Sequence, residues 1–350
     1  MDLNAVWQDY GLDQLEAGVS QLFPENRISV GGLLEQVMAG DILGALSGLF
    51  SGIAGNLTAQ ASGYKNLFLW LLLLGIASSL VVHFVEVFDM HQVADLSFYF
   101  MYLLFTAILL KCFAQAAETA AAALENITLF IRMLAPAYLL ATGVSGGSVT
   151  AGVTGQLMLL VIYGVECILG QLILPLVYSF VMLSLVNGIW AEEKLTLLLD
   201  LLAKGIGWIL KGALGIITGV SIFQALITPV VDSVRKSALQ KVISAIPGVG
   251  NVADGALELV LGSALVIRNS VGVVLLLLML ALCAAPLLKI GVLAAILKCA
   301  AAFLGLVSDR RITLCANRAG DAGLMLLRTT GTAMLLFLIS VAVAAAAARA

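Results

Sequence analysis

Apolar stretches long enough to cross a lipid bilayer follow one another along most of this chain, from about residue 66 to residue 348. Residues 149–190, for example, carry a single charged side chain, Glu166. A helical crossing needs only about 20 apolar residues. The whole chain has 61% hydrophobic and 11% charged residues, whereas a soluble domain carries about 25% charged residues. The sequence therefore predicts an all-α, polytopic integral membrane protein.

The chain divides into two regions of different composition. Residues 1–64 are polar up to Arg27 and amphipathic after it, and they hold seven acidic residues with Arg27 as their one base. Few basic residues are typical of a non-cytoplasmic segment, so we expect region 1–64 to be extracytoplasmic or interfacial. The N-terminus lacks the basic flank and apolar run of a signal peptide. Removal of a native signal peptide is one explanation of how region 1–64 could be extracytoplasmic without such a segment. Residues 65–350 are expected to form a multi-pass domain with about seven crossings, within a range of six to nine.

The expected crossings begin with 66–83, 96–117 and 126–144, followed by two within 149–190 that are hinged near Gly170-Gln171. Thr228-Pro229 predicts a helix start, and the basic amphipathic segment 229–246 is short and charged enough to lie in the membrane interface. Segment 251–267 is too short to span, which favours a re-entrant element. Residues 271–307 form either a helical pair or one crossing plus a tilted helix. Basic segments 229–247 and 308–322, the second interpreted as a loop, are both expected in the cytoplasm. An even number of crossings must then lie between them, which favours the helical pair.

Small residues predict close helix contacts at two places. Four glycines spaced by four residues keep to one side of a helix, and two more continue a polar stripe further along the chain. Such bare stripes allow another helix to approach closely, although a flexible interfacial helix is the alternative for the first set. These candidate packing or oligomer positions are Gly40, Gly44, Gly48, Gly52, Gly215 and Gly219.

Charged residues within or beside the apolar stretches form a second class of candidates, because charges in a membrane usually face a bundle interior or water. One set recurs every three or four residues and so shares a helix face. This candidate polar seam is Glu193, Asp200, Lys204 and Lys211. A second set is the candidate ion pair Arg132 and Glu166. Snorkelling of long side chains near helix ends is the alternative interpretation for such charges.

A glycine-rich connector, residues 143–152, is the third candidate. Irregular backbone at membrane depth is tolerated only where protein or water satisfies it. Gly143, Gly146 and Gly147 are therefore a candidate constriction, with an ordinary external loop as the alternative.

Motifs for catalysis do not appear in the sequence. There is no Gly-Lys dipeptide and hence no P-loop, and His83 and His91 have no companion cysteine ligand. We therefore expect no enzyme activity, no catalytic residues, no metal and no cofactor. The net charge of −3 gives no reason to expect a nucleic-acid partner.

The order and spacing of several segments resemble the stage III sporulation protein AE family of endospore-forming bacteria. The resemblance covers roughly residues 30–345. The segments that carry it are 145–147 (Ser-Gly-Gly), 219–221 (Gly-Val-Ser), 237–238 (Ser-Ala), 246–250 (Ile-Pro-Gly-Val-Gly), 262–263 (Gly-Ser), 269–272 (Asn-Ser-Val-Gly) and 283–289 (Cys-Ala-Ala-Pro-Leu-Leu-Lys).

The resemblance implies a place in the eight-protein AA–AH complex, in the mother-cell membrane around the forespore. It implies a channel or feeding-tube function with stage II sporulation protein Q as a further partner, and an AA partner that resembles secretion ATPases. We accordingly expect an oligomeric, non-enzymatic channel subunit in a bacterial cell membrane. The alternatives are a stand-alone secondary transporter of a small solute and a membrane scaffold that recruits partner proteins.

Overall fold

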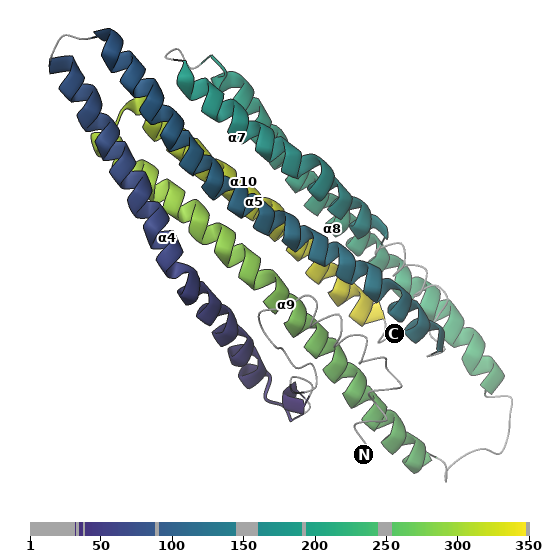
Figure 1. The fold of residues 1–350 in the computed structure, drawn as a ribbon. Helices are drawn as coiled ribbons and strands as arrows, with labels where there is room; N and C mark the ends of the chain where they lie inside the picture. Colours follow the sequence, from purple (N-terminus) through teal and green to yellow (C-terminus); the bar gives the residue numbers. More distant parts are fainter. Residues whose placement is uncertain are drawn as a thin grey trace.

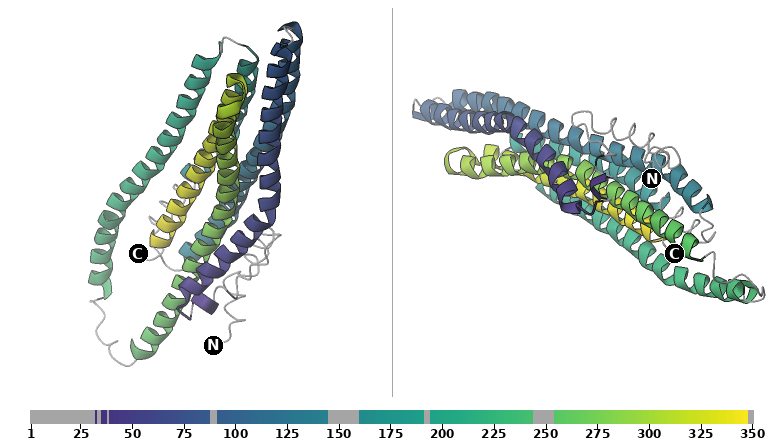
Figure 2. Two further views of the ribbon diagram at one scale, coloured as in Figure 1. Left: turned by 90° about the vertical axis from the view of Figure 1, so that its left-hand side faces the viewer. Right: turned by 90° about the horizontal axis from the view of Figure 1, so that it is seen from below.

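The computed structural model describes residues 32, 35–37, 39–87, 91–144, 160–190, 194–243 and 254–347. These residues form an elongated bundle of long helices (Figures 1 and 2). The elements are α4 (Ile42–Val87), α5 (His91–Val144), the π-helix η1 (Leu169–Ile173), α7 (Leu174–Ile189), α8 (Thr196–Ile243), α9 (Asp254–Val307) and α10 (Arg310–Ala347). Residues 160–168 are also helical and run directly into η1.

The helices pair as three consecutive hairpins whose connections lie at one end of the bundle (Figure 1). These connections fall at residues 88–90, 190–195 and 308–309. Within the described residues, six helical segments are long and apolar enough to cross a membrane, and all six adjoin this connected end. They are Gly63–Val81, Leu96–Leu129, Leu160–Ile189, Thr196–Val220, Cys283–Val307 and Arg310–Leu338. The predicted all-α, polytopic architecture is therefore confirmed.

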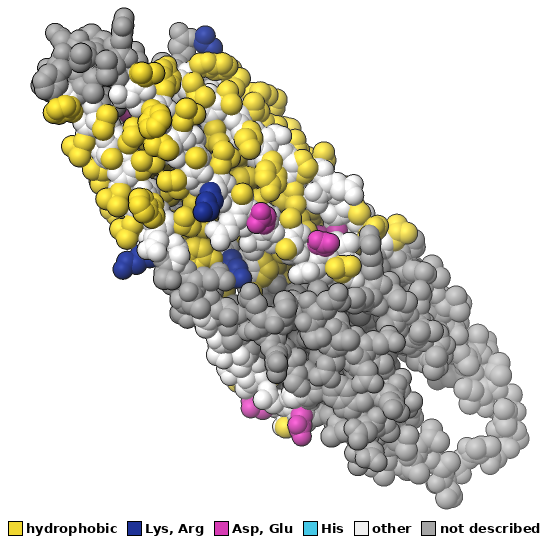
Figure 3. Space-filling view, in the orientation of Figure 1, with side chains coloured by type: hydrophobic (Ala, Val, Ile, Leu, Met, Phe, Trp, Pro, Cys, Tyr) yellow, Lys and Arg dark blue, Asp and Glu magenta, His cyan; other side chains and the backbone are white. Residues whose placement is uncertain are grey.

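Several helices are much longer than a bilayer is thick. At about 1.5 Å per residue, the 54 residues of α5 or α9 extend for about 81 Å, against a hydrocarbon core of about 30 Å. On the face seen in Figure 3, the half of the bundle near the connected end is largely apolar where it is described. Side chains such as Leu80, Phe100 and Leu197 are exposed there, as expected for a surface that acyl chains cover.

The core follows the contact between α9 and α10, the most extensive in the bundle. Buried members of this core include Leu71, Phe105, Leu304 and Phe337, which come from four different helices. The α9–α10 connection docks against the side of α4. Ser79 donates a hydrogen bond to the Val307 carbonyl (2.6 Å), and Ser308 donates one to the carbonyl of Gly75 (3.3 Å). The connection therefore lies beside the candidate span of α4.

The structure merges crossings that the sequence analysis separated. Segments 96–117 and 126–144 both belong to the single helix α5. The described residues 160–189 form one candidate span rather than part of a hinged pair. The expected hinge coincides with η1, where the Leu174 N–H donates to the Leu169 carbonyl. The widened turn precedes a proline at the start of α7, and a proline cannot complete the regular hydrogen-bond ladder.

The second half of the chain also differs from expectation. Helix α8 continues past Thr228-Pro229 to Ile243, so the predicted helix start there is wrong. Segment 251–267, where described, forms the first turns of α9 instead of a separate element. Residues 271–307 form one helix through Pro286, so the favoured helical pair is wrong. The expected basic loop 308–322 is a two-residue connection followed by α10.

These corrections change the expected relation between the two basic segments. One long helix, with one candidate span, separates residues 229–243 from Arg310 and Arg311. The two segments therefore lie toward opposite ends of the bundle (Figure 1). Helix α9 stays continuous where a break was expected because it packs extensively along α10. The interfacial position of 229–246 remains a prediction.

Candidate functional site

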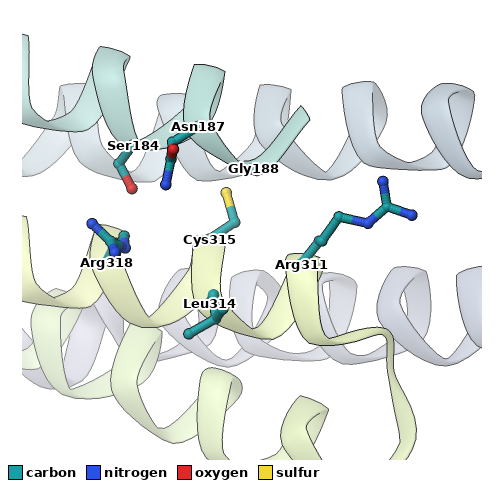
Figure 4. A pocket seen from close by; sticks show the side chains of 7 residues that line it. All are labelled: Ser184, Asn187, Gly188, Arg311, Leu314, Cys315 and Arg318. Carbon is teal, nitrogen blue, oxygen red and sulfur yellow. The ribbon is translucent and has the colours of Figure 1, made fainter. Parts of the chain in front are cut away.

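Polar side chains gather between α7 and α10, close to the connected end of the bundle. They line a cavity of about 10 Å³ formed by Ser184, Asn187, Gly188, Arg311, Leu314, Cys315 and Arg318. Ser184 and Asn187 of α7 face Cys315 and Arg318 of α10 (Figure 4). A cavity of this size holds about one water molecule. It is therefore too small to be a solute passage.

The same region is held together by buried hydrogen bonds. The Asn187 side-chain oxygen accepts from the Leu195 N–H (2.7 Å), which fixes the connection between α7 and α8. The Tyr102 hydroxyl of α5 donates to the Leu185 carbonyl (2.8 Å). Gly188 leaves room for this hydroxyl, because a Cβ at that position would collide with it. Polar groups here fix the relative positions of α5, α7 and α8.

An ion pair joins α9 and α10 within their candidate spans. The Lys298 ammonium donates to Asp321 Oδ1 (2.6 Å) and to Asn317 Oδ1 (2.7 Å). The side chains of Lys298 and Asp321 are 30% and 41% exposed. Gly320 lets the lysine stem lie across α10, since a Cβ there would be 2.9 Å from Lys298 Cγ. This group places charge on the outer surface of two spanning helices.

Glu166 is the most deeply buried charged residue that the sequence analysis singled out. It is 2% exposed, and neither carboxyl oxygen has a hydrogen-bond partner among the described residues. It precedes η1 by one turn and shares the buried face of Ile162 and Val165. A buried ionised carboxylate without partners is costly. The position therefore requires either a partner outside the described residues or the uncharged form of the side chain.

The predicted partner of Glu166 can be located only in part. Arg132 belongs to α5, but its side chain lies outside the described residues, so the pairing stays a prediction. Gly143 is in the last turn of α5. Gly146 and Gly147 lie outside the described residues, and the constriction also stays a prediction.

The four-residue glycine stripe does not lie on one helix. Gly40 adopts φ +83° in the turn before α4, so its expected place on the stripe is wrong. Asp41 then accepts the Gly44 N–H (2.8 Å) as an N-terminal cap, which explains why the helix starts there. Gly44, Gly48 and Gly52 follow in α4. A Cβ at Gly48, Gly215 or Gly219 would meet nothing within 4 Å, and their role in packing stays a prediction.

The candidate polar seam lies on α8. Asp200, Lys204 and Lys211 are exposed and form no hydrogen bond or ion pair with the part of the chain that the structure describes. Glu193 lies outside that part. Helix α8 has the smallest buried share of the six candidate spans, so this face is open in a single chain.

Sequence reasoning missed the link between Lys298 and Asp321. Lys298 lies within the apolar stretch 271–307, but its partner fell in residues interpreted as a basic loop. The spacing of Asn317 and Asp321, four residues apart, was the available signal for a shared helix face. Recognising α10 as starting at Arg310 was the missing step.

Comparison with known proteins identifies the relatives of this chain. A family model described as stage III sporulation protein AE matches residues 28–348. Stage III sporulation protein AE of Bacillus subtilis (strain 168) is 24% identical over 257 residues, which is 73% of this chain and 64% of that relative. The chain thus matches less than two thirds of the relative's length. No solved structure matches it.

The family match covers most of the chain, including all six candidate spans and both partners of the Lys298–Asp321 ion pair. The resemblance inferred from the order of sequence segments is thereby confirmed. The chain belongs to the stage III sporulation protein AE family.

Proposed function

We propose that this protein is a membrane-embedded channel subunit of a transport complex between mother cell and forespore. It performs no catalysis itself, and any energy comes from a partner ATPase. Membership of a sporulation family and six candidate spans provide the setting. The observation that carries the proposal is charge on the outer surface of spanning helices, represented by Lys298 and Asp321.

Charged side chains on the outer surface of spanning helices favour association of this chain with other proteins in the membrane. Insertion of a single lysine or aspartate at the bilayer centre costs about 2.5–3.5 kcal/mol on translocon scales. Pairing reduces this cost but leaves part of both side chains exposed. The exposed hydrogen-bonding groups of Lys298 and Asp321 need water or another protein as partners. A water-filled passage formed between chains supplies water, and the neighbouring chain supplies protein partners.

The partners follow from the family. We infer that the chain acts with the other AA–AH stage III sporulation proteins in the mother-cell membrane, and with stage II sporulation protein Q through the complex. The N-terminal region 1–64 is placed outside the cytoplasm in this proposal. Its low content of basic residues supports that side.

Reconstitution tests the proposal. Liposomes loaded with small fluorescent solutes are prepared with this chain alone and with the other members of the complex. We expect size-limited leak that requires the assembled complex and that falls when Asp321 is replaced by Leu. An assembled complex that leaves every solute sealed inside would refute a channel function and favour a scaffold.

The stand-alone transporter is distinguished by the same experiment. Coupled uptake by this chain alone, driven by an ion gradient, would identify it.

A further inference from the structure

Helix α5 carries a charged stripe on its outer surface. Lys111, Glu118 and Glu125 follow at seven-residue intervals and are all exposed. Seven residues are close to two helical turns, so the three side chains share one face. That face is opposite to the buried face that contains Phe105, Leu109 and other core residues. The charges therefore point away from the bundle.

Helix α10 carries a second stripe with the opposite order of charge. Asp321 and Arg328 are also seven residues apart, and Asn317 lies on the same side. Arg328 is exposed and forms no hydrogen bond or ion pair with the described residues. From the connected end, the charge on α5 is therefore positive at Lys111 and then negative at Glu118. On α10 it is negative at Asp321 and then positive at Arg328.

The two stripes point away from the contact between their helices. Helices α5 and α10 pack directly against each other, and each turns its buried face inward. Phe98 of α5 lies under the Arg311 guanidinium of α10, 3.9 Å from ring centroid to guanidinium carbon. At about 100° per residue, Lys111 and Glu118 lie roughly 140–160° around α5 from Phe98, and Asp321 and Arg328 lie roughly 80–100° around α10 from Arg311. Both stripes therefore point away from this contact and do not meet there.

The stripes stand at matching levels along the bundle. Both helices start at the connected end and run in the same direction (Figure 1). Measured from the Phe98–Arg311 contact at about 1.5 Å per residue, Lys111 is about 20 Å along α5 and Asp321 about 15 Å along α10. Glu118 and Arg328 follow at about 30 Å and 26 Å. The levels within each pair differ by only about 4–5 Å along the helices, which a long lysine or arginine side chain can span.

We propose that the α5 stripe of one chain docks on the α10 stripe of a second copy, with Lys111 beside Asp321 and Glu118 beside Arg328. All four residues lie inside candidate spans, where an exposed charge needs a protein or water partner. Neighbours related by an axis along the membrane normal stand at equal depth. Residues at equal levels therefore meet across the contact.

The charge order also selects the type of assembly. A two-fold contact that sets a stripe against its own copy would place Lys111 near Lys111, or Arg328 near Arg328. Like charges at such a contact are unfavourable. The complementary contact uses two different surfaces of the same chain, which is the head-to-tail arrangement that closes into a ring.

Charge reversal at the Glu118–Arg328 pair tests the contact. Neither residue has an ion pair within the described chain, so replacing them removes no ion pair described within one chain. Full-length protein is expressed in membranes, purified in nanodiscs and sized by native mass spectrometry. We expect Glu118→Arg and Arg328→Glu each to weaken association by about tenfold or more, as for close charge pairs at other interfaces. The double variant, which restores opposite charges at every contact, is expected to regain oligomers.

Two matched controls sharpen the result. Glu125→Arg makes the same substitution one heptad further along α5, where the corresponding α10 position is the apolar Leu335, and it is expected to leave association unchanged. Lys204→Leu tests the α8 seam. If Lys204→Leu abolishes oligomers and Glu118→Arg does not, the seam is the assembly face and the stripes are not.

Crosslinking supplies an independent readout. A cysteine-free chain carrying Glu118→Cys and Arg328→Cys is expected to form a disulfide-linked ladder in native membranes, whereas Leu73→Cys with Arg328→Cys is not. A monomeric wild-type chain, absent crosslinks, or a double reversal no better than the single ones would overturn the proposal. The proposed contact between stripes rests on the proposed function and specifies how the chains would assemble. Its tests measure association of chains, whereas the liposome test measures passage of solutes. Rings that form but do not leak would therefore contradict the channel function and leave the contact intact.

Discussion

The close approach of α9 and α10 at Gly323 leads to a quantitative prediction. A Cβ added at Gly323 would lie 2.9 Å from Ala294 Cβ and 3.2 Å from Ala294 Cα. Carbon atoms prefer separations of about 3.5–4.0 Å. Because the obstacle includes backbone, Gly323→Ala must push the two helices apart by on the order of 0.5–1 Å.

The expected cost follows from two opposing terms. Overpacking of a tight contact costs about 1–3 kcal/mol, and this one lies in the most extensive helix pair of the bundle. Alanine regains about 1 kcal/mol over glycine in helix propensity. We expect Gly323→Ala to lower the free energy of unfolding by up to about 2 kcal/mol, the difference between these terms.

The assay is reversible unfolding of the purified protein in mixed detergent micelles, followed by tryptophan fluorescence. Gly164→Ala is the matched control, because a Cβ at Gly164 would meet nothing within 4 Å. That variant is expected to be as stable as wild type or up to about 1 kcal/mol more stable. A Gly323→Ala protein as stable as the Gly164→Ala control, or more stable, would refute the argument from close approach.

Three further changes can be measured in the same micelles. Asp321→Asn should lower unfolding free energy by about 1–3 kcal/mol, since it removes the charged acceptor of Lys298; unchanged stability would show that solvent already screens the pair. Asn187→Ala should cost about 1 kcal/mol and speed hydrogen exchange at Leu195, whose amide it leaves without an acceptor. Glu166→Gln should cause no loss, because its carboxyl oxygens accept no hydrogen bond from the described residues; a marked loss would reveal a partner.

Local pattern was sufficient for the helical class and for the approximate position of several spans. The expected crossing 66–83 overlaps the candidate span Gly63–Val81, and Gly170-Gln171 marked the site of η1. The reason is that apolar length and proline act over a few residues. Such signals can be read without knowing what a segment packs against.

The same local signals failed where packing overrides them. Thr228-Pro229 predicted a helix start and residues 271–307 were expected to form a helical pair, yet α8 and α9 are each continuous there. Gly40 was placed on a helix face by its spacing, although it occupies a turn with positive φ. A helix boundary depends on the balance between one weak local preference and many contacts along the neighbouring helix.

From its sequence alone, this chain had to be a helical membrane protein of a sporulation family, because apolar length, scarcity of charge and the order of short segments are properties of the linear chain. Only the tertiary structure decided which charges meet. Lys298 reaches Asp321 because a two-residue turn folds α10 back along α9, and the α5 and α10 stripes point apart because their apolar faces pack together. Pairing across helices depends on rotation and level, which follow from packing and which no local pattern encodes.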